Sequence, residues 1–383
     1  MSYQIIQGDC IEGMKQIPDA SVHCVVTSPP YYGLRDYGVD GQIGLEESPE
    51  AYVARLVDVF REVRRILRDD GTVWLNLGDT YVSNAGDRNK VGGFQANPNK
   101  DRLSAESAMS FNKHGKGYKF KDLMGIPWRV AFALQADGWY LRQDIIWHKP
   151  NPMPESVTDR CTKSHEYIFL LSKSARYYFD HEAIKEVGVM TSQSSAGSNQ
   201  RDTSITHGVG GGNSGINEAK KKLAQELKLL GHSTRNKRSV WTVATQPYSE
   251  AHFATFPTKL IEPCILAGTS EKGCCATCGA PWKRVTEKTG EFQRRWSTNN
   301  AEGSPYESQG SMQNTYETVG WQPTCKCEIN DPVPCTVFDP FTGSGTTGLV
   351  ALTNNRIFVG TELNPEYVKI AEKRLSTVQP KLI

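Results

Sequence analysis

The segment of residues 336–362 constrains the fold more than any other part of the chain. Residues 336–338 have the apolar pattern of a short strand, a glycine-rich loop follows, a helix begins near Leu349, and residues 357–360 have the pattern of a second strand. A strand, a loop, a helix and a strand in this order predict a βαβ unit of a parallel sheet. The N-terminal part of the chain also alternates strand and helix patterns, so we expect an α/β fold with a doubly wound, mostly parallel sheet.

Residues 339–347 have the composition of a cofactor-binding loop. They read Asp-Pro-Phe-Thr-Gly-Ser-Gly-Thr-Thr, and Glu362 stands at the end of the next expected strand. Glycines let the backbone approach a ligand closely, and an acid at this strand end can accept hydrogen bonds from both hydroxyls of a ribose. The loop contains no lysine, which a Walker loop for a nucleoside triphosphate requires, so it favours a cofactor without phosphates, such as S-adenosylmethionine. A tight turn would explain the glycines, but not the order of strand, loop, helix, strand and acid.

A second motif lies near the N-terminus. Residues 22–26 form an apolar run typical of a buried strand, and Ser28-Pro29-Pro30-Tyr31 follows at once. A polyproline turn would explain this tetrapeptide alone, but not the cofactor loop far along the chain. Ser48 and Pro49 then predict a helix start, and an apolar stripe continues at helical spacing until Asp70-Gly71, where we expect the helix to stop.

With these two motifs the sequence resembles the amino-methyltransferases of DNA, which methylate the exocyclic nitrogen of cytosine or adenine. Residues 28–31 are similar to the family's catalytic tetrapeptide, and residues 339–345 with Glu362 are similar to its cofactor loop. The catalytic motif comes first, so the resemblance is to the circularly permuted β class with its Rossmann-like methyltransferase fold. Gly8-Asp9-Cys10 is similar to the segment that contacts the adenine, and residues 252–257 with Lys259 are similar to the segment that helps to hold the methionine end.

The resemblance also implies roles for individual residues. Catalytic roles fall on Ser28, Pro29, Pro30 and Tyr31, and cofactor-binding roles fall on Asp9, Cys10, Lys259, Asp339, Phe341, Gly343, Ser344, Gly345, Thr346, Thr347 and Glu362. We expect the Ser28 hydroxyl and the Pro29 carbonyl to accept the amine hydrogens of a flipped base, and Tyr31 to stack on that base. Within the family, serine at the first position favours N4-cytosine, and N6-adenine with the same mechanism is the open alternative.

Two Pro-Cys pairs raise a different chemistry, the attack of a cysteine on C5 of cytosine. Cys335 precedes the cofactor strand instead of following the catalytic one, and Cys264 lies in an apolar segment. We therefore expect both to be packed thiols.

Five of the ten cysteines lie in two tight clusters, at 274, 275 and 278 and at 325 and 327, and this clustering predicts a metal site before disulfides. Cys275 and Cys278 have the spacing of a zinc knuckle, and Cys325 and Cys327 can supply the other two ligands of a tetrahedral structural zinc. Cys274 is a rival ligand to Cys275, and free surface thiols are the alternative to a metal. We assign the metal no catalytic role.

Charge bears on how the chain contacts DNA. Its 44 Lys and Arg nearly balance its 42 Asp and Glu, so basic surface must be local. Residues 219–238 contain seven Lys or Arg and only one acid, Glu226. This segment lies where the family places target recognition. The run predicts phosphate contacts there, with a solvated helix face as the alternative. The loop at 83–119 and the insertion at 283–324 are further candidates.

These predictions divide the chain into parts. We expect a catalytic half at residues 1–180 with a mobile loop at 83–119, a target-recognition region at 181–240, a cofactor-binding half at 241–272 and 333–383, and a zinc-binding insertion at 273–332.

Double-stranded DNA is the implied partner, whereas a restriction endonuclease and a second copy of the chain are left open. With no secretory leader and no long apolar window, we expect a cytoplasmic protein of a prokaryotic or virus-infected cell. A non-catalytic zinc-containing DNA-binding protein and a methyltransferase of RNA or protein are the alternatives.

Overall fold

The computed structural model describes residues 2–34, 36–82, 118–187, 234–246, 256–288, 316–328 and 331–379. They form two units, one of Met1–Ala183, Arg238–Lys283 and Gln322–Ile383, the other of Ile184–Lys237 and Arg284–Trp321. Nearly all of the predicted loop at 83–119, the lysines at 220–222 and 228, and residues 252–255 lie outside the described residues. No helix in the described part of the chain is both long and apolar enough to cross a membrane.

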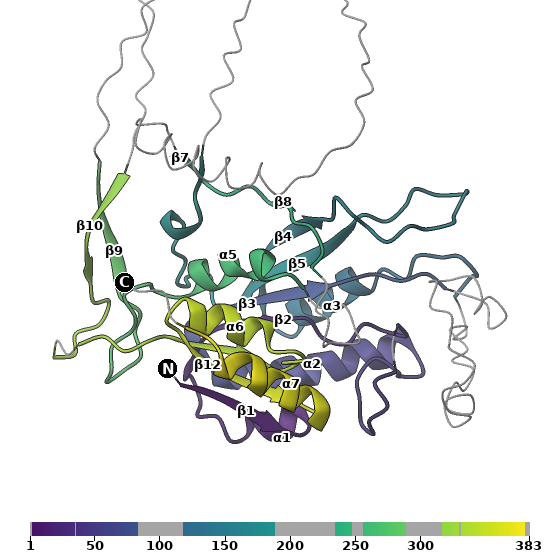
Figure 1. Ribbon diagram of the computed structural model, residues 1–383, viewed down its shortest axis with the longest axis horizontal. Helices are drawn as coiled ribbons and strands as arrows, with labels where there is room; N and C mark the ends of the chain where they lie inside the picture. Colours follow the sequence, from purple (N-terminus) through teal and green to yellow (C-terminus); the bar gives the residue numbers. More distant parts are fainter. Residues whose placement is uncertain are drawn as a thin grey trace, which may run out of the picture. The chain divides into compact units, whose positions relative to one another are not determined.

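The larger unit is organised around an eight-stranded sheet with the order β1-β12-β11-β2-β3-β5-β4-β8 (Figure 1). In that order the strands are Tyr3–Gln7, Ile357–Glu362, Thr336–Asp339, Val22–Thr27, Leu67–Leu77, His165–Ser172, Tyr140–His148 and Val240–Thr242. The neighbouring pairs are parallel except those of β5, which runs antiparallel to both β3 and β4. The prediction of a mostly parallel, doubly wound sheet is confirmed.

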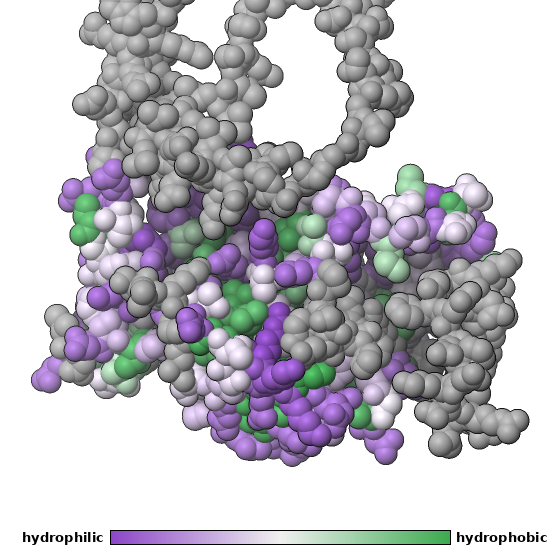
Figure 2. Space-filling model, in the orientation of Figure 1, coloured by the Kyte–Doolittle hydropathy of each residue, from purple (hydrophilic) through white to green (hydrophobic). Residues whose placement is uncertain are grey.

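Helices cover both faces of this sheet (Figure 1). The helices α1 (Cys10–Met14), α2 (Pro49–Ile66) and α3 (Ile126–Ala136) lie on one face, where their apolar side chains join the main core. The helices α5 (Thr258–Gly268), α6 (Thr346–Thr353) and α7 (Pro365–Ser376) cover the other face. The outer side of α7 is hydrophilic (Figure 2), and there Lys369 pairs with Glu366 at 2.8 Å. Every residue of β2 is buried, as expected for a central strand covered on both faces.

Helix α2 begins as predicted but ends earlier. Ser48 Oγ accepts a hydrogen bond from the Ala51 N–H at 3.1 Å, and Pro49 occupies the first turn. The helix stops at Ile66 instead of reaching Asp70-Gly71. Leu67 is already extended and pairs with Val22 in the sheet, so β3 takes over the residues that the sequence pattern assigned to the last helical turn.

The described part of the smaller unit contains two short sheets. One pairs β6 (Glu186–Val187) with β7 (Thr234–Arg235), after the 3-10 helix η2 (Glu182–Ile184). The other pairs β9 (Lys283–Lys288) with β10 (Tyr316–Gln322), and here the Arg284 guanidinium lies 4.4 Å from the centre of the Trp321 ring. The positive charge of the guanidinium is attracted to the electron-rich face of the ring, which links the two strands.

Candidate active site

Strands β11 and β2 lie side by side where the connections of the sheet diverge. The chain leaves β11 through α6 toward β12, and it leaves β2 through α2 toward β3 on the other side and the other face (Figure 1). In open α/β sheets, ligands bind at the carboxyl ends of strands at such a point. The glycine loop follows β11 and the Ser-Pro-Pro-Tyr segment follows β2. The fold therefore brings the two predicted motifs together from opposite ends of the chain.

Asp339 joins these two segments through its buried carboxylate. Thr27 Oγ1, at the end of β2, donates to Oδ1 at 2.7 Å, and the Phe341 N–H donates to the same oxygen at 3.0 Å. Thr347 Oγ1, in the first turn of α6, donates to Oδ2 at 2.7 Å. Burial raises the pKa of this carboxyl to about 6. Three protein donors thus occupy Asp339, which makes it a positioning residue for both loops.

We expect Asp339→Asn to change how stability depends on pH between about pH 4 and pH 6. The carboxyl pKa rises from its ordinary 3.8 to about 6 on folding, so the folded state binds more protons than the unfolded state in this window. The contribution of the carboxyl to the free energy of unfolding therefore falls as the pH rises, by roughly 3 kcal/mol in all. Urea unfolding at several pH values should show wild type losing stability relative to Asp339→Asn across the window. An equal difference at pH 4 and pH 7 would contradict this, and Asp58→Asn on the surface of α2 is the control.

Glu362 holds the glycine loop from the end of β12. Its Oε2 accepts a hydrogen bond from the Gly343 N–H at 2.8 Å, and its Oε1 accepts one from the Asn364 N–H at 2.9 Å. Burial raises the pKa of this carboxyl. Gly343 and Gly345 have φ angles of 52° and 77°, in the left-handed region that favours glycine. Each Glu362 oxygen keeps lone pairs for a further donor, so the loop and the acid fit the ribose of an adenosine cofactor.

Arg374 of α7 supports the loop from behind, and the sequence analysis missed it. Its Nη1 lies 3.1 Å from the Ser344 carbonyl oxygen, 3.2 Å from Ser344 Oγ and 3.0 Å from Thr346 Oγ1. The side chains of these two predicted cofactor residues therefore face the protein, and the loop can present its backbone to a ligand. No motif marks Arg374, because its role depends on how α7 packs against α6.

The predicted adenine-contacting segment follows β1. Asp9 caps α1: its Oδ1 accepts from the Ile11 N–H at 2.9 Å, and its Oδ2 lies 3.0 Å from Arg55 Nη2. Cys10 is buried in the core, which raises its pKa to about 12. The Gly8 N–H donates to the Glu362 carbonyl at 2.8 Å, so this segment lies directly beside the acid at the end of β12.

Two further predicted cofactor residues, Phe341 and Lys259, and two predicted packed thiols also lie in the larger unit. Phe341 is partly buried against the main core, and Lys259 is exposed in the first turn of α5. Cys264 and Cys335 are 0% and 1% exposed, as expected for packed thiols.

The Ser-Pro-Pro-Tyr segment is tied to β3 and β5 through the Tyr31 hydroxyl. This hydroxyl donates to Glu166 Oε2 at 2.7 Å and accepts a hydrogen bond from Ser28 Oγ at 3.3 Å. Burial and the Glu166 carboxylate raise the pKa of Tyr31 well above its usual value. Asn76 Nδ2 also donates to Glu166 Oε2, at 3.3 Å, and Lys149 pairs with the other Glu166 oxygen. The sequence analysis missed Asn76, Lys149 and Glu166.

A second set of contacts fixes the backbone of the same segment. Tyr52 of α2 donates its hydroxyl to the Pro30 carbonyl at 2.9 Å, and the Tyr32 ring packs 5.5 Å from the Tyr52 ring. A Cβ on Gly78 would lie 2.6 Å from the Tyr31 ring, so glycine is required directly after the end of β3, where the chain passes the tyrosine. Tyr32 is 2% exposed and packs beneath the loop.

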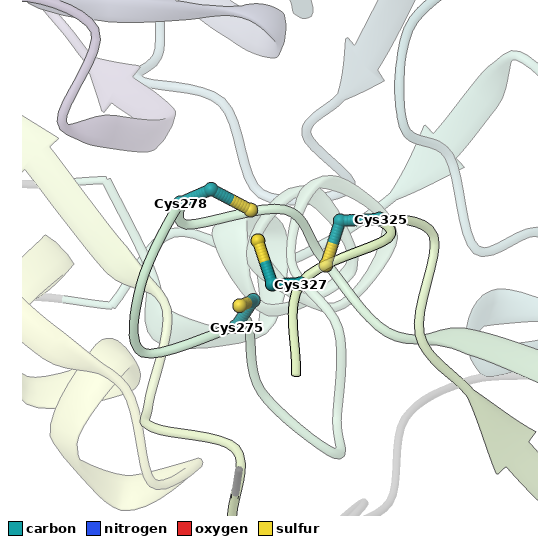
Figure 3. Close-up of side chains that lie close together, drawn as sticks. All are labelled: Cys275, Cys278, Cys325 and Cys327. Carbon is teal, nitrogen blue, oxygen red and sulfur yellow. The ribbon is translucent and has the colours of Figure 1, made fainter. Parts of the chain in front are cut away.

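Six of the ten cysteines fall into two groups. The sulfurs of Cys275, Cys278, Cys325 and Cys327 lie within 4.8 Å of one another and point toward a common centre (Figure 3). Cys274 belongs to another group with His23 and Cys335. The structure thus places the four predicted zinc ligands together.

The sheet order, the two loops at the diverging point and the acids at the ends of β11 and β12 define the class as the Rossmann-like methyltransferase fold. The solved structure of the PvuII DNA methyltransferase, described as cytosine-N4-specific, shares it with a TM-score of 0.51. The two chains are 16% identical, and the match covers 100% of this chain and 89% of that one. This likeness concerns the fold alone.

The chain belongs to the DNA methylase family that comprises the N6-adenine and N4-cytosine amino-methyltransferases. The family model matches residues 22–276 and 334–373. The chain is 40% identical over 372 residues to the Type II methyltransferase M.Cfr9I of Citrobacter freundii, which covers 97% of this chain and 87% of that protein. It is 38% identical over 375 residues to the Type II methyltransferase M.SmaI of Serratia marcescens, covering 98% and 91%. The resemblance to DNA amino-methyltransferases is confirmed at the level of the family.

Proposed function

We propose that this protein is a β-class, site-specific DNA methyltransferase that transfers the methyl group of S-adenosylmethionine to the N4 amine of cytosine. The observation that carries the proposal is the hydrogen bond from Thr27 Oγ1 to Asp339 Oδ1, which fixes the start of the tetrapeptide beside the glycine loop. Membership of the DNA methylase family supports the reaction. Serine at position 28 supports cytosine, on the family resemblance.

The cofactor would occupy the loop at the end of β11. S-adenosylmethionine supplies an electrophilic methyl group when it is bound. Glu362 would accept hydrogen bonds from the ribose hydroxyls, and the glycine backbone would let the ligand approach. Asp9 and Cys10, next to the end of β12, would hold the adenine, and Phe341 and Lys259 would be the further contacts. The side chains of Asp339, Ser344, Thr346 and Thr347 act by holding the loop.

The hydrogen-bond direction at Ser28 determines what this hydroxyl can do. Its proton is directed to Tyr31, whose own proton is directed to Glu166. The Ser28 oxygen is therefore left with lone pairs for the amine of a base, and the Pro29 carbonyl is the second acceptor. Two acceptors orient the amine nitrogen for in-line attack, so positioning and electrostatics supply the catalysis. The base must leave the double helix to reach this site, and Tyr31 is the stacking partner.

Product analysis tests the proposal. Purified protein is incubated with S-adenosylmethionine and unmethylated double-stranded DNA of mixed sequence, and the nucleosides are identified by mass spectrometry. We expect N4-methylcytosine, and far less of it with Ser28→Ala, which removes the hydroxyl acceptor and leaves the Pro29 carbonyl in place. N6-methyladenine would overturn the assignment of the base and leave the family membership intact. Methylation of RNA or protein in competition with DNA would overturn the assignment of the substrate.

Recognition of the DNA sequence falls to residues 181–240 in this proposal, with the catalytic half at 1–180 and the cofactor half at 241–272 and 333–383. The basic run within 219–238 supports phosphate contacts. The relatives are named Type II methyltransferases, which supports a partnership with a restriction endonuclease. The protein would act in the cytoplasm of a prokaryote or of a cell that hosts a virus.

A further inference from the structure

A four-cysteine centre lies in the larger unit, away from the carboxyl ends of the strands. Its sulfurs come from two segments that are distant in sequence, Cys275 with Cys278 and Cys325 with Cys327, and they all lie within 4.8 Å of one another (Figure 3). The mechanism proposed above uses none of these thiols. A group of four converging thiols therefore requires its own explanation.

The backbone around the first pair has the form of a knuckle. The Gly279 N–H donates to the Cys275 carbonyl at 2.8 Å, and the Cys275 N–H donates to the Ala280 carbonyl at 2.9 Å. Gly279 has a φ of 71°, which favours glycine directly after the second cysteine. Thr324 Oγ1 donates to the Pro281 carbonyl at 2.8 Å and brings the second pair against the first. The fold thus builds the site from backbone turns as well as from side chains.

Spacing and ligand chemistry both fit zinc. Tetrahedral Zn–S bonds of about 2.3 Å separate neighbouring sulfurs by roughly 3.8 Å, which agrees with the observed grouping. Soft thiolates select zinc over calcium or magnesium, and four of them leave no open coordination position. Four ionised thiols this close would repel one another, and a divalent cation removes that repulsion.

The neighbouring group of His23, Cys274 and Cys335 does not offer a comparable site. The Thr336 N–H donates to His23 Nδ1 at 3.0 Å, so the ring proton lies on Nε2, which faces the Gly279 carbonyl at 2.8 Å. Both ring nitrogens are engaged, and the Cys274 thiol lies 3.4 Å from the Val333 carbonyl. Of the two rival ligands, Cys275 therefore belongs to the four-cysteine group, and Cys274 belongs to the group with His23 and Cys335.

Hydrogen bonds connect the knuckle around Cys275 and Cys278 to the eight-stranded sheet. His23 belongs to β2, the strand that ends in Ser28, and it donates to the carbonyl of Gly279. Arg68 of β3 donates to the Cys278 carbonyl at 2.8 Å, while its own Nε is held by Asp70 at 2.8 Å. In sequence the two cysteine pairs flank residues 283–324. A metal here would close the ends of that segment and fasten them to the amino ends of β2 and β3.

We propose that Cys275, Cys278, Cys325 and Cys327 bind one structural Zn²⁺ that fastens the ends of the 283–324 segment to strands β2 and β3. The purified full chain should contain one zinc per chain by mass spectrometry of metals. Cys278→Ser should lower zinc affinity at least tenfold. Cys274→Ala and Cys161→Ser, an exposed cysteine outside both groups, should keep the full content.

Measurements on the wild-type chain keep the proposal testable if Cys278→Ser does not fold. X-ray absorption at the zinc edge should show four sulfur neighbours at about 2.3 Å, and Co²⁺ in place of zinc should give the spectrum of a tetrahedral four-thiolate site. Removal of zinc by a chelator should lower the melting temperature by several degrees, with recovery when zinc returns. Failure to take up zinc from an equimolar solution, iron in its place, or disulfides among these four cysteines would each overturn the proposal. None of these measurements depends on methylation.

Discussion

Replacing Glu362 by glutamine is expected to weaken the binding of S-adenosylmethionine by about 10- to 100-fold. The carboxylate accepts the N–H groups of Gly343 and Asn364 at 2.8 and 2.9 Å, and its remaining lone pairs are those available to a ribose. A glutamine amide presents a donor to one of these two N–H groups, so the loop loses a hydrogen bond and the ligand loses a charged acceptor. Hydrogen bonds to charged groups contribute about 1.5–3 kcal/mol each.

Calorimetric titration with S-adenosylmethionine measures this effect. Glu366→Gln is the matched control, because Glu366 lies nearby in the first turn of α7, is exposed and pairs with Lys369. We expect this control to bind the cofactor as wild type does. An unchanged dissociation constant for Glu362→Gln would remove the acid from the cofactor site, and a loss of folding would appear as a changed far-ultraviolet circular dichroism spectrum.

The central strands and the glycine loop were predictable because local rules determine them. The continuous apolar run of β2 needs burial on both faces, Ser48 and Asn364 cap helices through their own side chains, and left-handed glycines mark the turn before α6. These signals depend on residues close in sequence. They give the order of elements, and the order of elements gives the site at the ends of β11 and β2.

The groups that complete the site were not predictable in the same way. Glu166 reaches Tyr31 because β5 enters the sheet antiparallel to β3, between β3 and β4, and nothing near Glu166 in the sequence reveals that register. Arg374 reaches Ser344 because α7 packs against the start of α6. The end of α2 was misplaced for a similar reason, since pairing with Val22 draws Leu67 into the sheet. Long-range pairing decided each of these cases.

Tyr31→Phe is expected to lower kcat by about 10- to 100-fold while leaving the binding of DNA and cofactor within a factor of about three. The substitution keeps the ring for stacking and removes only the hydroxyl that accepts from Ser28 and donates to Glu166. Without it the Ser28 hydroxyl is free to rotate, and its proton can point at the amine that the oxygen should accept. Misorientation of one catalytic group typically costs this much in rate.

A double-mutant cycle distinguishes this network from simple packing. Glu166→Gln removes the charge and one of the two acceptor oxygens at the far end of the chain of hydrogen bonds, so its effect on kcat should overlap with that of Tyr31→Phe, and the double variant should be little slower than the slower single variant. Tyr140→Phe, at the exposed start of β4, is the control and should change nothing. Additive losses would mean that the Tyr31 hydroxyl acts independently of Glu166, and an unchanged kcat for Tyr31→Phe would mean that Tyr31 acts on the base through its ring alone. If the double variant is little slower than the slower single variant, Tyr31 and Glu166 act together to orient the Ser28 proton away from the amine. Glu166 is then a positioning residue for Ser28.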